Sequence, residues 1–82
     1  MLLELHRRVS ATVSRYRQAG WCTTTELRTI EALWLDGISL REFARRQAVS
    51  AAAIGARIEG LARKAPEFYR WWLLKNRSRR RV

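Results

Sequence analysis

Apolar residues recur at helical spacing along most of the chain. In the first segment, residues 2–17, one face carries the apolar positions Leu2, Leu5, Val9, Val13 and Tyr16. Four later segments repeat this period, and only one proline and four glycines interrupt the 82 residues. So few turn-forming residues disfavour a fold of many short strands. The pattern predicts an all-α protein with five helices.

Boundary signals divide the chain into these helices. A hydroxyl residue followed three positions later by glutamate can satisfy the free N–H groups at a helix start, and such pairs occur at Thr23–Glu26 and Ser39–Glu42. Ser50 can cap a fourth helix, and Pro66 can open a fifth. We expect the second helix to end at Gly37, because glycine favours helix ends.

The inward faces of the later helices supply the expected core. The three middle helices are predicted to bury Leu27, Ile30, Leu33, Trp34, Leu40, Phe43, Ala44, Ile54, Ile58, Leu61 and Ala65. We expect the aromatic last helix to fill the core, with dimerisation as the alternative, through Phe68, Tyr69, Trp71, Trp72, Leu73 and Leu74. For the first helix the same two interpretations, packing in the core and dimerisation, stay open. Residues 1–74 are thus predicted to form one domain, and residues 75–82 a flexible basic tail.

The middle of the chain has the residue pattern of a helix-turn-helix. In such a motif the first helix is anchored to the core, a small residue lets the second helix cross closely, and an apolar residue fills the turn. The positions that match these roles are Leu40, Phe43, Ala44, Val49, Ile54 and Ile58. The motif is predicted at about residues 39–64.

Residues 26–64 resemble region 4 of bacterial sigma factors and are similar to LuxR-type DNA-binding domains. The resemblance covers about half of the chain, and it is carried by Glu26, Gly37, residues 39–44, Val49, Ser50, Ile54, Arg57, Ile58, Arg63 and Lys64. It implies that the helix from Ser50 to Arg63 is the recognition helix and that the domain binds promoter DNA. The sigma segments that open promoter DNA have no counterpart, so the resemblance implies a bacterial or phage transcription regulator or adaptor.

The recognition helix departs from the family pattern on its outer face. Opposite the inward Ile54, this face holds Ala52, Ala56, Glu59 and Arg63. Base edges are read mainly by Arg, Lys, Asn and Gln, so two interpretations stay open. In one, arginines hold phosphates and affinity exceeds sequence specificity. In the other, a ridge of Ala52, Ala56 and Gly60 lets a helix of RNA polymerase or of another regulator approach closely.

The chain is strongly basic. Lysine and arginine number 17 against 7 acidic residues, which gives a net charge of +10, and 15 of the 17 are arginine. So much charge on a small protein favours a polyanionic partner, and arginine binds phosphate bidentately, although a GC-rich genome would also enrich arginine. The predicted DNA-binding residues are Arg41, Arg45, Arg46, Ser50, Ala51, Ala52, Ala56, Arg57, Arg63, Lys64, Arg77, Arg79, Arg80 and Arg81.

Other kinds of site find little support in the sequence. No apolar run approaches the roughly 18 residues of a membrane span. The single Cys22 cannot form an internal disulfide, which is typical of a reducing compartment and predicts a cytoplasmic protein. His6 and Cys22 are too few ligands for zinc, and no carboxylate pair, activated nucleophile or phosphate-binding loop is evident. We expect no metal, no cofactor and no enzymatic activity.

The expected partners follow from charge and motif. They are double-stranded DNA, RNA polymerase or another transcription factor, and a second copy of the chain in a homodimer. No membrane partner is expected, since a membrane-surface or RNA-binding role would rest on charge and aromatic residues alone.

Overall fold

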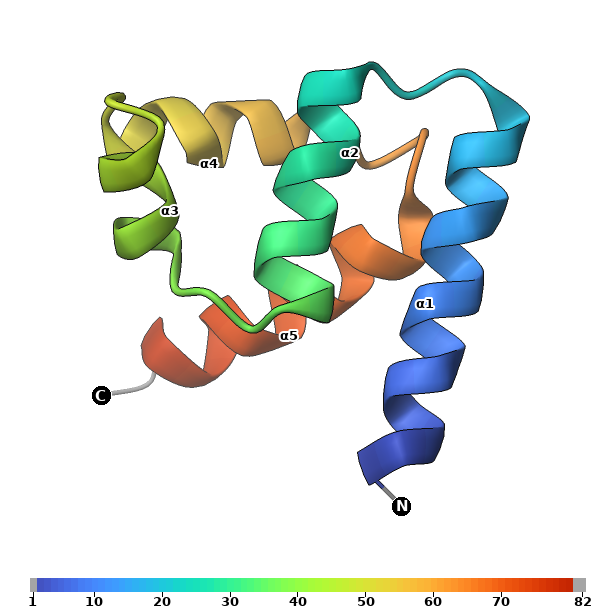
Figure 1. The fold of residues 1–82 in the computed structure, drawn as a ribbon. Coiled ribbons are helices and arrows are strands. Elements are labelled where there is room, and N and C mark those ends of the chain that lie inside the picture. Colours follow the sequence, from blue (N-terminus) through green and yellow to red (C-terminus); the bar gives the residue numbers. More distant parts are fainter. Residues whose placement is uncertain (1, 81–82) are drawn as a thin grey trace.

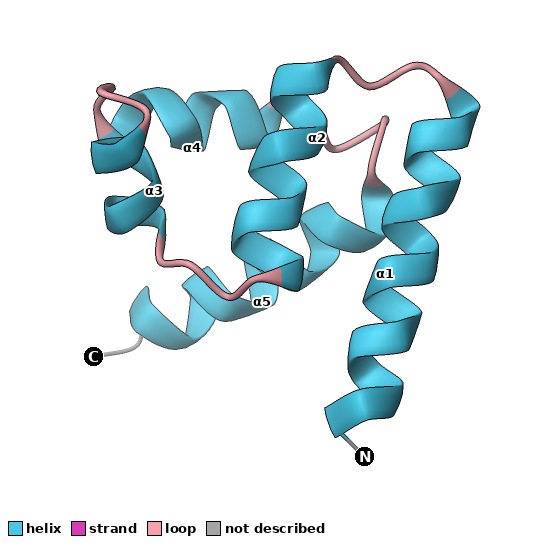
Figure 2. Ribbon diagram, in the orientation of Figure 1, coloured by secondary structure: helices cyan, strands magenta, loops and turns pink. Residues whose placement is uncertain are grey.

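The predicted helices follow one another in the expected order. The computed structural model describes the backbone of residues 2–80 and the side chains of residues 3–76. The elements in chain order are α1 (Leu2–Ala19), α2 (Thr24–Ile30), η1 (Glu31–Leu35), α3 (Leu40–Arg46), α4 (Ala51–Glu59) and α5 (Pro66–Arg80) (Figure 1). Because η1 continues α2 without a break, as a wider π-helical turn, the two form one helix. Residues 2–80 contain no strand (Figure 2), so the all-α, five-helix prediction is confirmed.

Side-chain hydroxyls set the helix starts, as the sequence predicts. The hydroxyl of Thr23 accepts the N–H of Glu26 at 3.1 Å, and the Glu26 carboxylate accepts the N–H of Thr23 at 2.8 Å, which completes a capping box. The Ser50 hydroxyl accepts the N–H of Ala53 at 3.1 Å and caps α4. Pro66 is the first residue of α5. These contacts satisfy N–H groups that have no partner within their own helix.

The loop between η1 and α3 matches its prediction only in part. Gly37, with φ +72°, follows the end of η1, and the Ser39 hydroxyl accepts the N–H of Glu42 at 3.1 Å. The predicted capping box at Ser39 is wrong in its second half, because the Glu42 carboxylate accepts hydrogen bonds from Arg45 and Arg46 instead. Two charge-assisted bonds to guanidinium groups outweigh one bond to a neutral backbone N–H.

Side chains from all five helices form one core, as predicted. Phe68 on α5 is completely buried, and its ring lies 5.9 Å from the rings of both Trp34 and Trp71. The buried residues are Val13, Tyr16, Thr29, Ile30, Ala32, Leu33, Phe43, Ala44, Ile54, Ile58, Leu61, Ala65 and Phe68. The prediction that the last helix fills the core is therefore confirmed for Phe68 and for the half-buried Trp71 and Trp72.

Several apolar side chains predicted to be inward lie at the surface. On α1, Val13 and Tyr16 of the predicted apolar stripe are buried, whereas Leu5 is 56% exposed, and the side chain of Leu2 lies outside the described residues. Leu73 and Leu74 on α5 are also exposed, because the side of α5 that faces the core is already occupied by Phe68 and its aromatic neighbours. Val49 does not fill the turn between α3 and α4, since it is 38% exposed.

Two helix boundaries differ from the sequence prediction. The helix expected from Ser50 to Arg63 ends at Glu59, and residues 60–64 form turns. The N–H of Leu61 bonds to the carbonyl of Ile58 at 2.9 Å, a tighter turn that keeps Leu61 directed into the core. The segment predicted as a flexible tail continues α5 through Arg80.

Across the described residues, no helix combines the length and the apolar content needed to cross a bilayer.

Candidate nucleic-acid interface

The helix pair α3–α4 is held in a fixed orientation by its inner side chains and its turn. Phe43 on α3 and Ile54 on α4 are both buried in the core. In the turn, the N–H of Ala48 bonds to the carbonyl of Arg45 at 3.1 Å, and the N–H of Val49 bonds to the carbonyl of Ala44 at 3.0 Å. Ala48 adopts a left-handed conformation with φ +57°. Anchored in this way, α4 presents one constant face to the outside.

The outer face of α4 carries methyl groups in place of polar side chains. Ala51, Ala52, Ala53 and Ala56 are all exposed. At the end of the helix, the exposed Glu59 accepts a hydrogen bond from the Tyr69 hydroxyl at 2.7 Å, and this bond raises the pKa of Tyr69. A helix with so little side-chain bulk can approach a flat or grooved surface closely, but these methyl groups offer no hydrogen bonds to base edges.

Three exposed arginines lie on α3, and two of them are paired within the helix. The Glu42 carboxylate accepts from Arg45 at 2.5 Å and from Arg46 at 2.9 Å. The hydrogen bonds from Arg46 and Arg45 lower the pKa of Glu42, which keeps it ionised. Arg41, one turn before Arg45, makes none of the ion pairs found among the described side chains. Arg41 is therefore the α3 cation most accessible to a phosphate.

Two residues predicted to contact DNA are used inside the protein. Arg57 is half-buried, and its guanidinium lies 3.4 Å from the hydroxyl of the buried Thr29. The Lys64 ammonium donates to both carboxylate oxygens of Glu26 at 3.1 Å. Burial alone would raise the pKa of Glu26, but the hydrogen bonds from the Thr23 backbone and from Lys64 lower it. Both cations thus join the α4 region to α2.

The remaining arginines that were predicted to bind DNA lie after α4 and toward the C-terminus. Arg63 is exposed in the turns that follow α4. Arg77, Arg79 and Arg80 belong to the last part of α5, where only the backbone is described, and Arg81 lies outside the described residues. The structure therefore packs α3, with its exposed arginines, against α4, whereas Arg77, Arg79 and Arg80 lie on a separate helix, α5.

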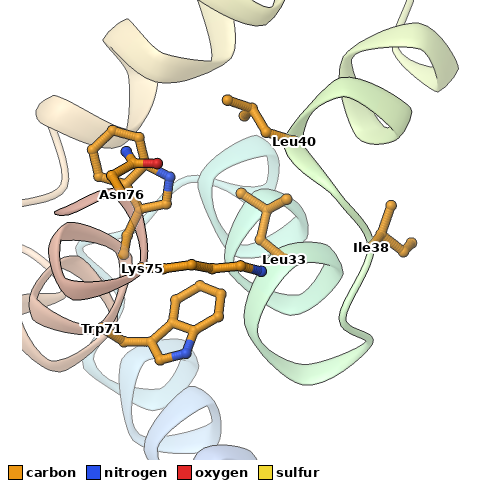
Figure 3. A pocket seen from close by; sticks show the side chains of 7 residues that line it. Leu33, Ile38, Leu40, Trp71, Lys75 and Asn76 are labelled. Carbon is orange, nitrogen blue, oxygen red and sulfur yellow. The ribbon is translucent and has the colours of Figure 1, made fainter. Parts of the chain in front are cut away.

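The C-terminal part of α5 lies beside the start of α3. A shallow hollow there is lined by Leu33, Ile38, Leu40, Trp71, Trp72, Lys75 and Asn76 (Figure 3). The Lys75 ammonium lies 5.0 Å above the ring of Trp71, a cation–π contact that holds the side chain across the hollow. This arrangement places Lys75, near the C-terminal end of α5, beside Leu40, the first residue of α3.

The sequence prediction considered each basic residue separately and missed the acidic residues that pair with some of them. Glu42 precedes Arg45 and Arg46 by three and four residues, a spacing at which helical side chains meet, so this signal was present in the sequence. The pairing of Lys64 with Glu26, 38 residues away, has no comparable local signal. Each such pair reduces the positive charge that is free to meet a ligand.

Soft metal ligands are sparse. Among the described residues, no three His, Cys, Asp or Glu side chains gather in a geometry that could hold a metal ion. Cys22 is half-buried between α1 and α2, and burial raises the pKa of its thiol. A raised pKa keeps the thiol protonated and therefore weakly nucleophilic.

Comparison with protein-family models, with curated proteins and with solved structures finds no match to this chain. What the α3–α4 surface binds is therefore inferred from its geometry and charge.

Proposed function

We propose that this protein is a small bacterial or phage transcription regulator that binds duplex DNA with α3 and α4 acting as a helix-turn-helix. In this arrangement α3 lies over the DNA backbone and α4 enters a major groove. The observation that carries the proposal is the packing of α3 against α4, in which the outer residues of α4 are exposed and α3 carries three exposed arginines.

The chemistry of this surface favours affinity over sequence specificity. Arginines supply charge-assisted bonds to phosphate oxygens, and each neutralised phosphate contributes to a steep salt dependence. The outer methyl groups of Ala52 and Ala56 can contact a thymine methyl, but they provide none of the bidentate bonds that distinguish base pairs. We therefore expect the protein to bind many duplexes with similar strength.

The test is a fluorescence-anisotropy titration at two salt concentrations with the DNA upstream of its own coding sequence and with a scrambled duplex. We expect affinities that agree within about tenfold and that fall steeply with salt. Arg41→Gln is expected to weaken binding and to reduce the salt slope by about one. The matched control is Arg7→Gln, which removes the same charge from an exposed arginine on α1. Equal effects of the two variants would show that net charge alone attracts the DNA, and the site assignment would be wrong.

A second function is favoured by one specific observation. Ala52 and Ala56 on α4 and Gly60, which directly follows α4, are all exposed, and small residues at a contact shorten the distance between helix axes. The alternative is an interaction module that uses this ridge to bind RNA polymerase or another regulator. Ala56→Leu would then abolish co-elution with purified bacterial RNA polymerase while leaving weak DNA binding unchanged. Co-elution that survives this substitution would exclude the ridge as the contact.

A further inference from the structure

The outer side of α5 is an exposed surface that the helix-turn-helix proposal does not use. Leu73 is 44% exposed and Leu74 is 59% exposed. They follow the exposed Arg70 by three and four residues, so both leucines lie one turn beyond Arg70 on the same side of the helix. We call Arg70, Leu73 and Leu74 the outer α5 surface.

Arg70 gives this surface a positive charge. None of the ion pairs among the described side chains involves Arg70. The acid nearest in sequence, Glu67, is already bound by Arg15 and Tyr16, and no acidic residue follows it. The sequence continues with Lys75, Arg77, Arg79, Arg80 and Arg81. The outer α5 surface therefore combines two exposed apolar side chains with an arginine whose nearest acid along the helix, Glu67, is already occupied by partners on α1.

We infer that the outer α5 surface binds an acidic amphipathic helix of a partner protein. Carboxylates of that helix would pair with Arg70, and its apolar side chains would pack on Leu73 and Leu74. Arginine and large apolar side chains are the residues that dominate binding energy at such contacts. Complementary charge would also accelerate the encounter with a chain of net charge +10.

Other occupants fit this surface less well. A second copy of the chain would bring a second unpaired Arg70 to the same interface without supplying an acidic partner, and like charges at an interface are repulsive. A lipid bilayer requires an apolar face with its cations on the opposite side, whereas here Arg70 lies on the same side of the helix as the two leucines. A nucleic-acid backbone would pair with Arg70 but would leave both leucines without apolar contacts. The inference is independent of DNA binding by α3 and α4.

The test uses a fluorescein-labelled peptide of about 18 residues, long enough to form a helix, built from Glu, Leu and Ala with its leucines on one face. A scrambled peptide of the same composition controls for bulk charge attraction, and vesicles containing phosphatidylglycerol report membrane binding. We expect the full-length protein to bind the ordered peptide at least about tenfold more tightly than the scrambled one.

Substitutions locate the contact on the protein. The double variant Leu73→Ser with Leu74→Ser is expected to weaken peptide binding by about tenfold or more. Leu3→Ser, which changes an even more exposed leucine on α1, is expected to have no effect. Arg70→Gln, compared with Arg7→Gln on α1, tests the charge separately and does so even if the double variant folds poorly. Helical circular dichroism checks each fold.

Three outcomes would overturn the inference. One is equal binding of the ordered and scrambled peptides. Another is peptide binding that is unchanged by the double variant and by Arg70→Gln. The third is vesicle binding that depends on Leu73 and Leu74 while the ordered peptide does not bind, which would identify a membrane surface as the occupant. Loss of DNA binding in the same preparations would bear only on the helix-turn-helix proposal.

Discussion

The hydroxyl of Tyr16 on α1 donates a hydrogen bond to the carboxylate of Glu67 in the first turn of α5. The same oxygen accepts the backbone N–H of Glu67 at 3.2 Å and that of Phe68 at 3.3 Å. Arg15 adds an ion pair to Glu67 at 2.7 Å. A side chain from the first helix therefore satisfies N–H groups at the start of the last helix, which have no partner of their own.

Replacing Tyr16 by phenylalanine should destabilise the fold by about 2 kcal/mol, because it leaves buried N–H groups without an acceptor. The measurement is urea unfolding followed by circular dichroism. Tyr69→Phe is the control, since it removes an equivalent hydroxyl whose bond to Glu59 lies at the exposed surface. A loss no larger for Tyr16 than for Tyr69 would show that the hydroxyl does not cap α5.

The same contact predicts how stability depends on acid. The hydrogen bond from Tyr16, followed by bonds from the Glu67 backbone and Arg15, lowers the pKa of Glu67 below its ordinary value of 4.5. A lowered pKa in the folded state contributes stability above that ordinary value, and the contribution disappears as the pH falls through the folded pKa. Glu67→Gln should be less stable than the wild type at neutral pH, and the difference should shrink below about pH 4. Urea unfolding across this range tests it, and a constant difference would contradict it.

The buried face of α4 should be far more sensitive than the surface of α5. Ile54 is completely buried, so Ile54→Ala should cost about 3 kcal/mol through lost burial and the cavity left behind. Leu73→Ala removes similar apolar volume at an exposed position and should cost much less. Thermal unfolding of the two variants provides the comparison. Similar losses would mean that α4 is not anchored as described.

Local signals predicted most of the fold. The hydroxyl caps at Thr23 and Ser50 act over three residues, and the inward positions Ile54, Ile58 and Leu61 follow from a regular period, so neither requires knowledge of the tertiary structure. The same reasoning extended α4 too far. Its apolar period continues past Glu59 even though the backbone tightens at Gly60, because a turn can also direct Leu61 inward.

Contacts between distant segments set the limits of the sequence prediction for the candidate site. The sequence positions of Arg57 and Lys64 suggested phosphate binding. In the structure Arg57 donates a hydrogen bond to Thr29, and Lys64 donates one to Glu26, although both acceptors are distant in sequence. The π-helical turn of η1 likewise has no simple residue signature, since it depends on how the end of that helix is accommodated in the tertiary structure. Sequence reasoning predicted the cations of the site but not which of them are already paired.

The turn between α3 and α4 contains a backbone strain that can be removed. Ala48 has φ +57°, a conformation that costs an L-residue with a Cβ about 1 kcal/mol and that glycine adopts freely. We therefore expect Ala48→Gly to leave stability unchanged or to raise it by up to about 1 kcal/mol, even though glycine usually destabilises a chain. Urea unfolding measures the change, and a clear loss would place Ala48 in an ordinary turn conformation.

The Glu42 carboxylate should compete with DNA phosphates for Arg45 and Arg46. Its carboxylate holds Arg45 and Arg46 at 2.5 and 2.9 Å, so Glu42→Gln releases two arginines beside α4. Because exposed ion pairs are weak, we expect duplex affinity to rise by only about threefold, with a steeper salt dependence. Glu4→Gln is the matched control, since it makes the same change in net charge and releases Arg8 on α1. If Arg45 and Arg46 contact phosphates, only Glu42→Gln should raise duplex affinity in the anisotropy assay. An equal rise in affinity for both variants would contradict a DNA contact at α3.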